Sequence, residues 1–324
     1  MSRIILRIIT ATQLTRLTLA FGAISDVWLV ILLSRVDVEL TVHAGSNLPR
    51  MPLWLAMTAG TLAAIGFFAY VTAINDVLDV KRDAAFSPDR PIPAGRIRQG
   101  QAVVVAIAAL ICALLAAAAF GGWSMHLAAL TAIGMLFYNA TGRFVPAVGI
   151  VTIGLIQGLH MLIPNAEFAF MLPVWTTVTH GMTVMAAVHV FASKRPPLSK
   201  RGIVGAATGW VIVTVAIFAV AKTRGGLWPI DRPLILLVWP GLAAASFVGL
   251  FVWVVRRGEG RVVADRLIRL GAVWQSFLAA SWLAVTGLHV AAVSVAVLAV
   301  MGLGAMLLAE TLTSLIAQPL NYRS

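Results

Sequence analysis

The sequence predicts an all-α membrane protein, a polytopic bundle of nine to ten transmembrane helices. Hydrophobic residues make up 60% of the 324 residues and charged residues only 11%, a composition typical of chains embedded in lipid. The apolar runs are continuous and rich in Ala, Leu and Val, whereas a membrane β-barrel alternates apolar and polar residues. Lys and Arg are concentrated in alternate loops, as the positive-inside rule requires.

Ten apolar stretches, each about the length of a bilayer span, follow one another along the chain. They cover about 14–34, 52–74, 101–120, 123–141, 145–163, 169–192, 203–221, 232–255, 267–286 and 289–310. The first has no small-residue cleavage site and is interpreted as a retained helix. Only Gly287 and Leu288 separate the last two stretches, so these form either a tight hairpin or one broken helix.

The distribution of charge indicates the orientation of the chain. If all ten stretches cross the membrane, both termini lie in the cytoplasm, and five of the 24 Lys and Arg residues lie outside while 19 lie inside. This topology accounts for the net charge of +12, so we expect no nucleic-acid partner. The single cysteine, Cys112, excludes a disulfide within the chain and a cysteine-based metal site.

Acidic residues are concentrated in one stretch that follows the second apolar run, Asn75 to Arg98, which reads NDVLDVKRDAAFSPDRPIPAGRIR. On a helix, Asp76, Asp79 and Asp83 would lie within an arc of roughly 60°. Carboxylates gathered in this way repel one another unless a cation lies among them, and oxygen ligands without His or Cys favour Mg²⁺. A solvated charge run balanced by neighbouring basic residues is the alternative explanation.

The pattern NDxxDxxxD from Asn75 to Asp83, followed by RPIPAGR from Arg90 to Arg96, resembles the signature of the UbiA superfamily of intramembrane prenyltransferases. The resemblance implies a UbiA-like bundle with one prenyltransferase-like domain over 1–324. It also implies an isoprenyl diphosphate substrate, a hydrophobic or aromatic acceptor, a surrounding membrane lipid, and an active face on the cytosolic side of a bacterial inner membrane. Asp76, Asp79 and Asp83 would then be the catalytic residues and the Mg²⁺ ligands.

The same resemblance indicates substrate-binding residues near the acidic motif. Asn75 belongs to the motif itself, and Arg90 and Arg96 lie on a proline-interrupted segment where they would clamp a diphosphate. Tyr138 and Arg143, at the end of the fourth stretch, lie where family members often carry a tyrosine and a basic residue. Anchoring at the membrane interface is the alternative role for these side chains.

Polar residues inside apolar stretches are costly in lipid, so they indicate an interior cavity. Asp26 and Gln157 are therefore candidates for cavity lining, and Gln157 is counted among the substrate-binding residues. His160, His180 and His189 are more simply explained by hydrogen bonds between helices.

A second acidic motif, usual in active UbiA members after the sixth span, is missing here. The equivalent stretch, His189–Arg201, contains no carboxylate and resembles the divergent EboC-like branch. Lys194, Arg195, Lys200 and Arg201 could replace the second metal cluster by binding the diphosphate directly. Alternatively, the protein is a catalytically degenerate lipid-binding accessory protein. A transporter is disfavoured, because no internal repeat with broken helices is evident.

Overall fold

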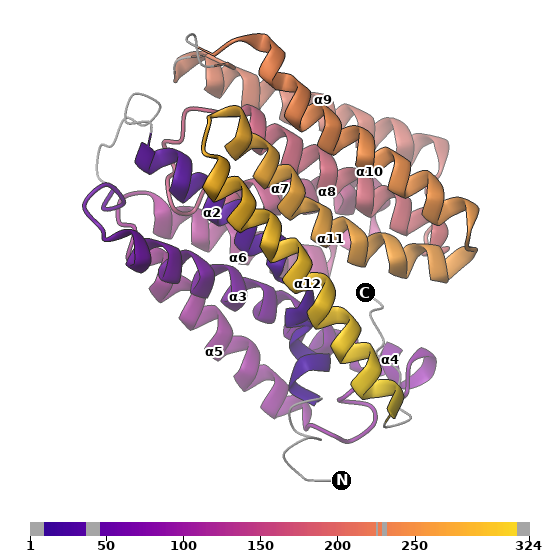
Figure 1. The fold of residues 1–324 in the computed structure, drawn as a ribbon. Coiled ribbons are helices and arrows are strands. Elements are labelled where there is room, and N and C mark those ends of the chain that lie inside the picture. The colour runs from indigo at the N-terminus through magenta and orange to yellow at the C-terminus, as the bar shows by residue number, and fades with distance from the viewer. Residues whose placement is uncertain (1–9, 37–45, 225, 229–231, 316–324) are drawn as a thin grey trace.

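The computed structural model describes residues 10–36, 46–224, 226–228 and 232–315. Within these ranges the chain is helical and has no β-strand, although Ser46 and Gly121 form an isolated bridge. The helices form an elongated bundle in which most axes run along the same direction (Figure 1). The predicted class, an all-α polytopic bundle, is confirmed. The principal helices are α2 (Phe21–Val36), α3 (Leu53–Leu78), α4 (Val80–Phe86), α5 (Gln99–Ala118), α6 (Ser124–Ala140), α7 (Pro146–Met161), α8 (Leu172–Phe191), α9 (Lys200–Thr223), α10 (Val238–Arg256), α11 (Gly260–Val285) and α12 (His289–Leu315).

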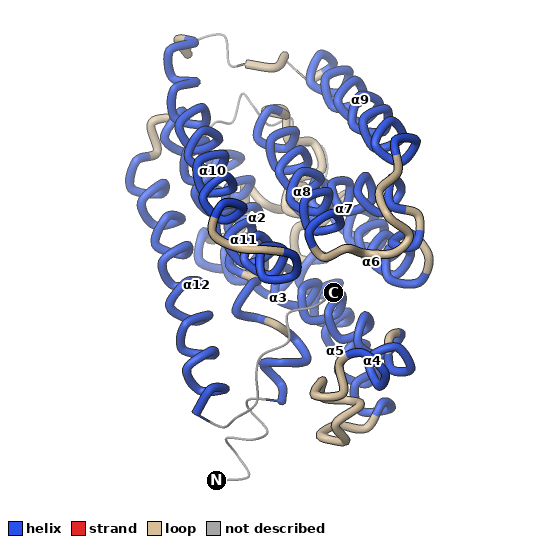
Figure 2. The backbone as a smooth tube through the Cα atoms, turned by 90° about the vertical axis from the view of Figure 1, so that its right-hand side faces the viewer, coloured by secondary structure: helices blue, strands red, loops and turns tan. Residues whose placement is uncertain are grey.

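Each of the ten predicted apolar stretches is represented by one long helix, and the short α4 follows α3 at one end of the bundle (Figure 2). In the part of the chain that the structure describes, six helices are long and apolar enough to cross a bilayer: α3, α5, α9, α10 with the turn before it, α11 and α12. Burial separates inner from outer helices. The most apolar windows of α3 and α11 are 56% and 61% buried, whereas that of α9 is only 6% buried, so α9 faces lipid along most of its surface.

The long helix of the first apolar stretch, α2, begins later than the stretch predicts. The stretch starts near residue 14, but α2 begins at Phe21, because Arg16 has a left-handed backbone (φ 47°) that interrupts the helix. A short 3₁₀ turn, Leu17–Leu19, then leads into α2. The interruption directs the Arg16 side chain toward Asp76 at the end of α3.

The last two stretches form a hairpin and not one broken helix. Gly287 has a positive φ of 79°, a conformation that residues with a Cβ rarely adopt. Its N–H donates to the Ala284 carbonyl, and the Leu288 N–H donates to the Leu283 carbonyl at 3.0 Å, a glycine-terminated helix end. The chain therefore reverses, and α12 packs back against α11 (Figure 1).

Polar contacts in the bundle interior join α2 to α11 and to α3. Ser25 donates to Ser276 of α11 at 2.7 Å, and Gln275 donates to the Asp26 carboxylate. On the opposite side, the Trp28 indole donates to Thr61 of α3 at 2.9 Å. α2 is thus the element that fixes α3 relative to α11, and the interior cavity described below lies between them.

α3 and α5 approach each other closely because small residues face one another. Gly66 has no side chain, and a Cβ placed there would lie 2.8 Å from the Ala109 carbonyl oxygen and 2.9 Å from the Ala113 Cβ. Contacts this short are not tolerated, so the helix spacing depends on glycine at this position.

We therefore expect Gly66→Val to destabilise the protein by about 1–3 kcal/mol through overpacking. The measurement is the midpoint of thermal unfolding of the protein in detergent. Gly304→Val is the matched control, because no described atom lies within 4 Å of a Cβ at Gly304 in α12. Equal midpoints for the two variants would contradict the close packing of α3 against α5.

Candidate active site

The three aspartates of the acidic motif lie on one continuous helical path. α3 ends at Leu78 and α4 begins at Val80, but the backbone hydrogen bonds continue across the junction. The Asp79 N–H donates to the Asn75 carbonyl at 3.0 Å, and the Asp83 N–H donates to the Asp79 carbonyl at 2.7 Å. All three side chains are buried, with 2%, 5% and 6% of the residue exposed for Asp76, Asp79 and Asp83. The helical spacing used to interpret the motif therefore holds.

Each of these carboxylates is paired with arginine. Arg90 bridges two of them, since its Nη1 lies 2.7 Å from Asp83 and 3.3 Å from Asp76. Arg16 adds a second contact to Asp76 at 3.0 Å. The arrangement brings Asp76 and Asp83 to the same guanidinium, seven residues apart in sequence.

Arg143 neutralises the remaining aspartate. Its guanidinium makes two contacts with the Asp79 carboxylate, one of them at 2.7 Å, and also donates to Asn75 Oδ1 at 2.9 Å. Such a bidentate ion pair is strong and directional. Three buried carboxylates thus face three buried or nearly buried guanidinium groups, contributed by three separate parts of the chain.

Arg96, by contrast, does not reach the aspartates. It donates to Gln13 Oε1 at 2.5 Å and to the carbonyl oxygen of Asp89. These contacts join the proline-containing segment to the start of the chain. The geometry gives Arg96 a role in holding that segment, whereas Arg90 lies within the acidic cluster.

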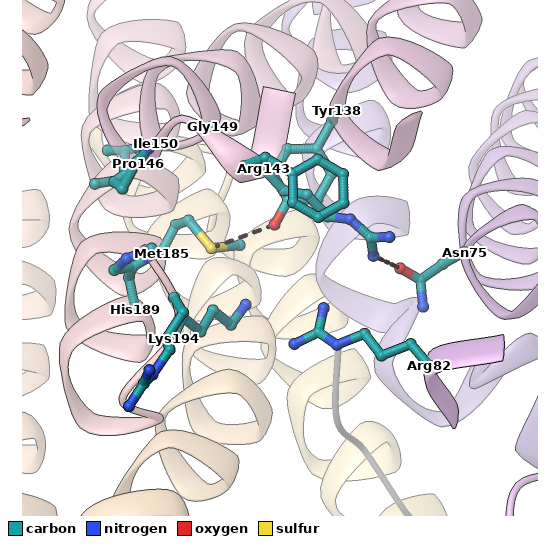
Figure 3. Close-up of a pocket in the computed structure, with 12 residues that line it drawn as sticks. Asn75, Arg82, Tyr138, Arg143, Pro146, Gly149, Ile150, Met185, His189 and Lys194 are labelled. Carbon is teal, nitrogen blue, oxygen red and sulfur yellow. Dashed lines mark hydrogen bonds between the residues drawn. The ribbon is translucent and has the colours of Figure 1, made fainter. Parts of the chain in front are cut away.

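A pocket next to the cluster, which we call the mouth pocket, is lined by residues of α3, α4, α6, α7 and α8 and of the connection after α8 (Figure 3). Arg82 and Lys194 extend toward each other across it, and the Tyr138 hydroxyl contacts Met185 Sδ at 3.6 Å (Figure 3). Like charges facing each other favour an anion between them. Burial, together with the positive charges of Arg143 and Arg82, lowers the pKa of Lys194 to about 8.

A wider cleft of about 600 Å³ adjoins the mouth pocket, and both acidic residues, among them Asp79 and Asp83 of the motif, and basic residues line it. Lys194 and Arg195 lie on its wall, where the second acidic motif would stand in the resembling family. Arg261 of α11 joins them. The cleft therefore combines carboxylates with several cationic side chains, and α11 contributes Asp265 to its lining beside Arg261.

Below the mouth lies a deep cavity of about 260 Å³ that is largely apolar. Met185 lines both the mouth pocket and this cavity, while Val188 and Ile268 line both the cleft and this cavity. Gln157, predicted as a substrate-binding residue, lies in the deep cavity and not at the mouth. The charged pockets and the apolar cavity therefore share wall residues and adjoin one another.

The donor set at the cluster suits a magnesium ion that arrives with a phosphate ligand. Among the described residues, no group of three His, Cys, Asp or Glu side chains is placed to form a complete metal cage. Asp76 Oδ2 is nevertheless buried and has no hydrogen-bond partner within the described ranges. Mg²⁺ commonly uses one or two carboxylates and completes its shell with water and substrate phosphates, so the residues present fit that mode.

Two residues of this region were not identified from the sequence as site residues. Arg16 lies near the start of the first apolar stretch and Arg82 lies between Asp79 and Asp83, and no motif marks either as a site residue. A signal existed for Arg16, because a charged residue at the start of an apolar stretch is costly unless it has a partner. His189, by contrast, contacts the Pro196 carbonyl oxygen at 2.9 Å and holds the connection after α8.

The fold and the site together define an integral membrane protein with buried, paired acidic and basic side chains at one end of a helical bundle. The UbiA prenyltransferase family model matches residues 40–257, more than half of the sequence. The chain belongs to the UbiA prenyltransferase family.

Individual relatives agree with this assignment. The digeranylgeranylglyceryl phosphate synthase of Methanothrix thermoacetophila is 34% identical over 90 residues, which cover 28% of this chain and 34% of the relative. The match thus spans about a third of that curated relative. The solved structure reported for digeranylgeranylglyceryl phosphate synthase in membranes has a TM-score of 0.56 at 15% identity, covering 86% of this chain and 98% of the other. A UbiA homolog from Archaeoglobus fulgidus has a TM-score of 0.54 at 16% identity, covering 85% and 98%. At such identities the structures show a shared fold.

The Arg143–Asp79 pair should be essential to stability. We expect Arg143→Met to destabilise the protein by about 3–5 kcal/mol, because it leaves a buried carboxylate without its countercharge. The double variant Arg143→Met/Asp79→Asn should recover part of the loss. A double-mutant cycle on thermal unfolding midpoints measures the coupling.

The control for this cycle is Arg257→Met, which removes an exposed arginine that lies over the Trp253 ring. It should change the midpoint little. Additive effects of the Arg143 and Asp79 substitutions would show that the pair is not formed.

Proposed function

We propose that this protein transfers an isoprenyl group from an isoprenyl diphosphate to a hydrophobic or aromatic acceptor, with Mg²⁺ assistance, at the cytosolic face of the membrane. The observation that carries the proposal is the placement of the acidic motif and its arginines directly above an apolar cavity inside the bundle. Membership of a prenyltransferase family supports the reaction class. We extend the proposal to one functional domain over 1–324 and to a bacterial inner membrane.

Binding of the diphosphate would exchange ion-pair partners at the cluster. Arg90 and Arg143 lie against the carboxylates in this structure. In the presence of a diphosphate and a divalent cation, these arginines would turn to the phosphate oxygens, and Asp76, Asp79 and Asp83 would hold the cation. Bound Mg²⁺ would supply Lewis-acid stabilisation of the departing diphosphate. No unpaired charge need be left in the buried site at any stage, which keeps the cost of desolvation low.

Basic residues would take the place of the missing second acidic motif. Lys194, Arg195 and Arg261 line the cleft, as does Arg82, which lies in the sequence between Asp79 and Asp83. Positive side chains in this position can neutralise the charge that develops on the leaving group without a second metal cluster. This explains how the His189–Arg201 stretch could serve catalysis without a carboxylate.

The apolar cavity would protect the reactive carbon. Loss of diphosphate leaves an allylic carbocation that water would capture, and a site lined by apolar side chains excludes water. Phe67, Phe68 and Met135 are among the residues that line the cavity. An electron-rich acceptor held there would react with the cation instead.

A second candidate function, a non-catalytic isoprenoid- or lipid-binding accessory protein, is favoured by one observation. Every aspartate of the motif is already neutralised by arginine, and no complete metal cage is found among the described residues. Such a protein would bind isoprenyl diphosphates but leave them intact.

The two functions differ in turnover. We expect purified protein in lipid to release diphosphate from radiolabelled geranyl, farnesyl or geranylgeranyl diphosphate when Mg²⁺ and a lipid extract are supplied. Asp76→Asn and Asp83→Asn should each lower the rate at least 100-fold, because both carboxylates belong to the metal-facing cluster. EDTA should abolish the reaction.

Asp89→Asn serves as the control for this assay, since Asp89 is exposed and lies on the same connection. Substrate binding without release, for all three chain lengths, would reject the enzyme and support the accessory role. Full activity of Asp76→Asn would reject the assigned site.

Affinity for the diphosphate should depend on pH through Lys194. With a pKa of about 8, this lysine is an ammonium below that pH and becomes neutral above it, so affinity should fall as pH rises through about 8. Isothermal titration calorimetry with an unreactive geranyl thiolodiphosphate between pH 6.5 and 9.5 measures the effect. Lys194→Arg should remove the fall, because arginine stays charged throughout this range. An identical pH profile for the two proteins would contradict this role.

A further inference from the structure

A pocket of about 560 Å³, which we call the far pocket, lies at the end of the bundle opposite the acidic cluster. It is lined by the first turns of α6, by the connection from α7 to α8 and by Arg224, which follows α9. The last turn of α6 carries Tyr138 of the mouth pocket, and the 17 residues of α6 extend about 25 Å at 1.5 Å per residue. The far pocket is therefore separate from the site described above, and the proposed prenyl transfer does not use it.

Two opposite charges lie next to each other in the far pocket. Arg224 Nη1 donates to the carbonyl oxygens of Ala166 at 2.8 Å and Phe168 at 3.1 Å, the two residues on either side of Glu167. These bonds hold the guanidinium beside the glutamate, and Arg224 and Glu167 both line the pocket. Within the described ranges, however, no ion pair joins the Glu167 carboxylate to Arg224. Each charge is thus available to a ligand.

An apolar strip along α6 begins at the same pocket. Leu130 lines the pocket, and Leu130, Ile133 and Phe137 are all exposed large hydrophobic residues. Their spacing places them on one face of the helix, which we call the α6 strip. Trp123 is exposed at the start of the same helix and also lines the pocket. Because tryptophan is typical of the boundary between hydrocarbon and headgroups, we infer that the pocket lies at headgroup level and the α6 strip in the hydrocarbon.

The combination of charges and apolar surface restricts the occupant. A guanidinium binds phosphate well, but inorganic phosphate or an anionic headgroup would also face the Glu167 carboxylate, which repels it. A lipid without charge would pair with neither side chain. A zwitterionic headgroup supplies a phosphate for Arg224 and an ammonium for Glu167, and its acyl chains match the α6 strip.

We propose that the far pocket binds the headgroup of a zwitterionic phospholipid, with the phosphate against Arg224, the ammonium against Glu167 and an acyl chain along the α6 strip. The volume of about 560 Å³ lies in the usual range for small-ligand pockets, about 300–1,000 Å³. This lipid site does not depend on the prenyl-transfer function, because it uses none of the residues of the acidic cluster.

The test places a fluorescent reporter beside the pocket without filling it. The single cysteine, Cys112, is exposed, so the reporter protein carries Cys112→Ala and a bimane label on Ile133→Cys. It is reconstituted in mixtures of phosphatidylethanolamine and phosphatidylglycerol with equal acyl chains, in which one lipid is brominated in its chains. Quenching of bimane by bromine measures the relative affinity of the two lipids at this position. We expect phosphatidylethanolamine to be preferred at least threefold. Glu167→Gln should reduce the preference at least twofold, because the ammonium loses its countercharge.

The contact of Arg224 with phosphate is tested against a lipid that has none. In mixtures of phosphatidylethanolamine with monogalactosyldiacylglycerol, the reporter protein should prefer the phospholipid at least threefold, and Arg224→Gln should reduce this preference at least twofold. Unfolding midpoints show whether each variant is folded. If Arg224→Gln does not fold, because the bonds to Ala166 and Phe168 are lost, Glu167→Gln alone decides.

Glu259→Gln is the matched control for Glu167→Gln. Glu259 is an exposed glutamate directly before α11, at the end of the bundle that carries the acidic cluster, and its side chain does not cap that helix. This variant should keep the full preference for phosphatidylethanolamine. Equal affinity of the reporter protein for phosphatidylethanolamine and phosphatidylglycerol would overturn the proposal, as would an unchanged preference in Glu167→Gln. The readout is independent of turnover, so a protein that shows the preference but releases no diphosphate would refute the enzyme and retain the lipid site.

Discussion

Three carboxylates buried at the end of a membrane bundle require countercharges, and this requirement determines how the distant parts of the chain meet. The guanidinium groups come from the segment before α2, from the connection after α4 and from the junction of α6 with α7. Breaking any one pair would leave a charge with little solvation, which costs far more than an exposed ion pair contributes. The ion pairs that form the site are therefore also the contacts that close this end of the fold.

Most of the fold could be predicted from the sequence, because hydropathy indicates which segments lie in lipid. All ten long helices in the described part of the chain correspond to apolar stretches. The ends of the helices were harder to predict. α11 begins at Gly260, seven residues before the stretch that predicts it, since Arg261, Asp265 and Arg266 lower the local hydropathy without preventing helix formation. The delayed start of α2 has a different cause, the left-handed backbone of Arg16, which no periodicity reveals.

The site could be predicted from the sequence only in part. Helical spacing predicts that Asp76 and Asp83 share a face, and one guanidinium of Arg90 contacts both. The partners of the aspartates could not be predicted, because a long-range pair such as Arg143 with Asp79 depends on how separate helices pack. Gln157 was identified as polar in an apolar stretch, but its position in the deep cavity depends on the space left by Gly181.

The lipid exposure of α9 has a consequence for the membrane around the protein. Its 24 residues extend about 36 Å at 1.5 Å per residue, which exceeds the roughly 30 Å hydrocarbon thickness of a typical bilayer. Two hydrogen bonds from indole groups to threonine hydroxyls, Trp175 to Thr214 and Trp210 to Thr179, join it to α8. A helix of this length tilts or extends beyond the hydrocarbon core, and the two hydrogen bonds couple such an adjustment to α8, which lines the mouth pocket.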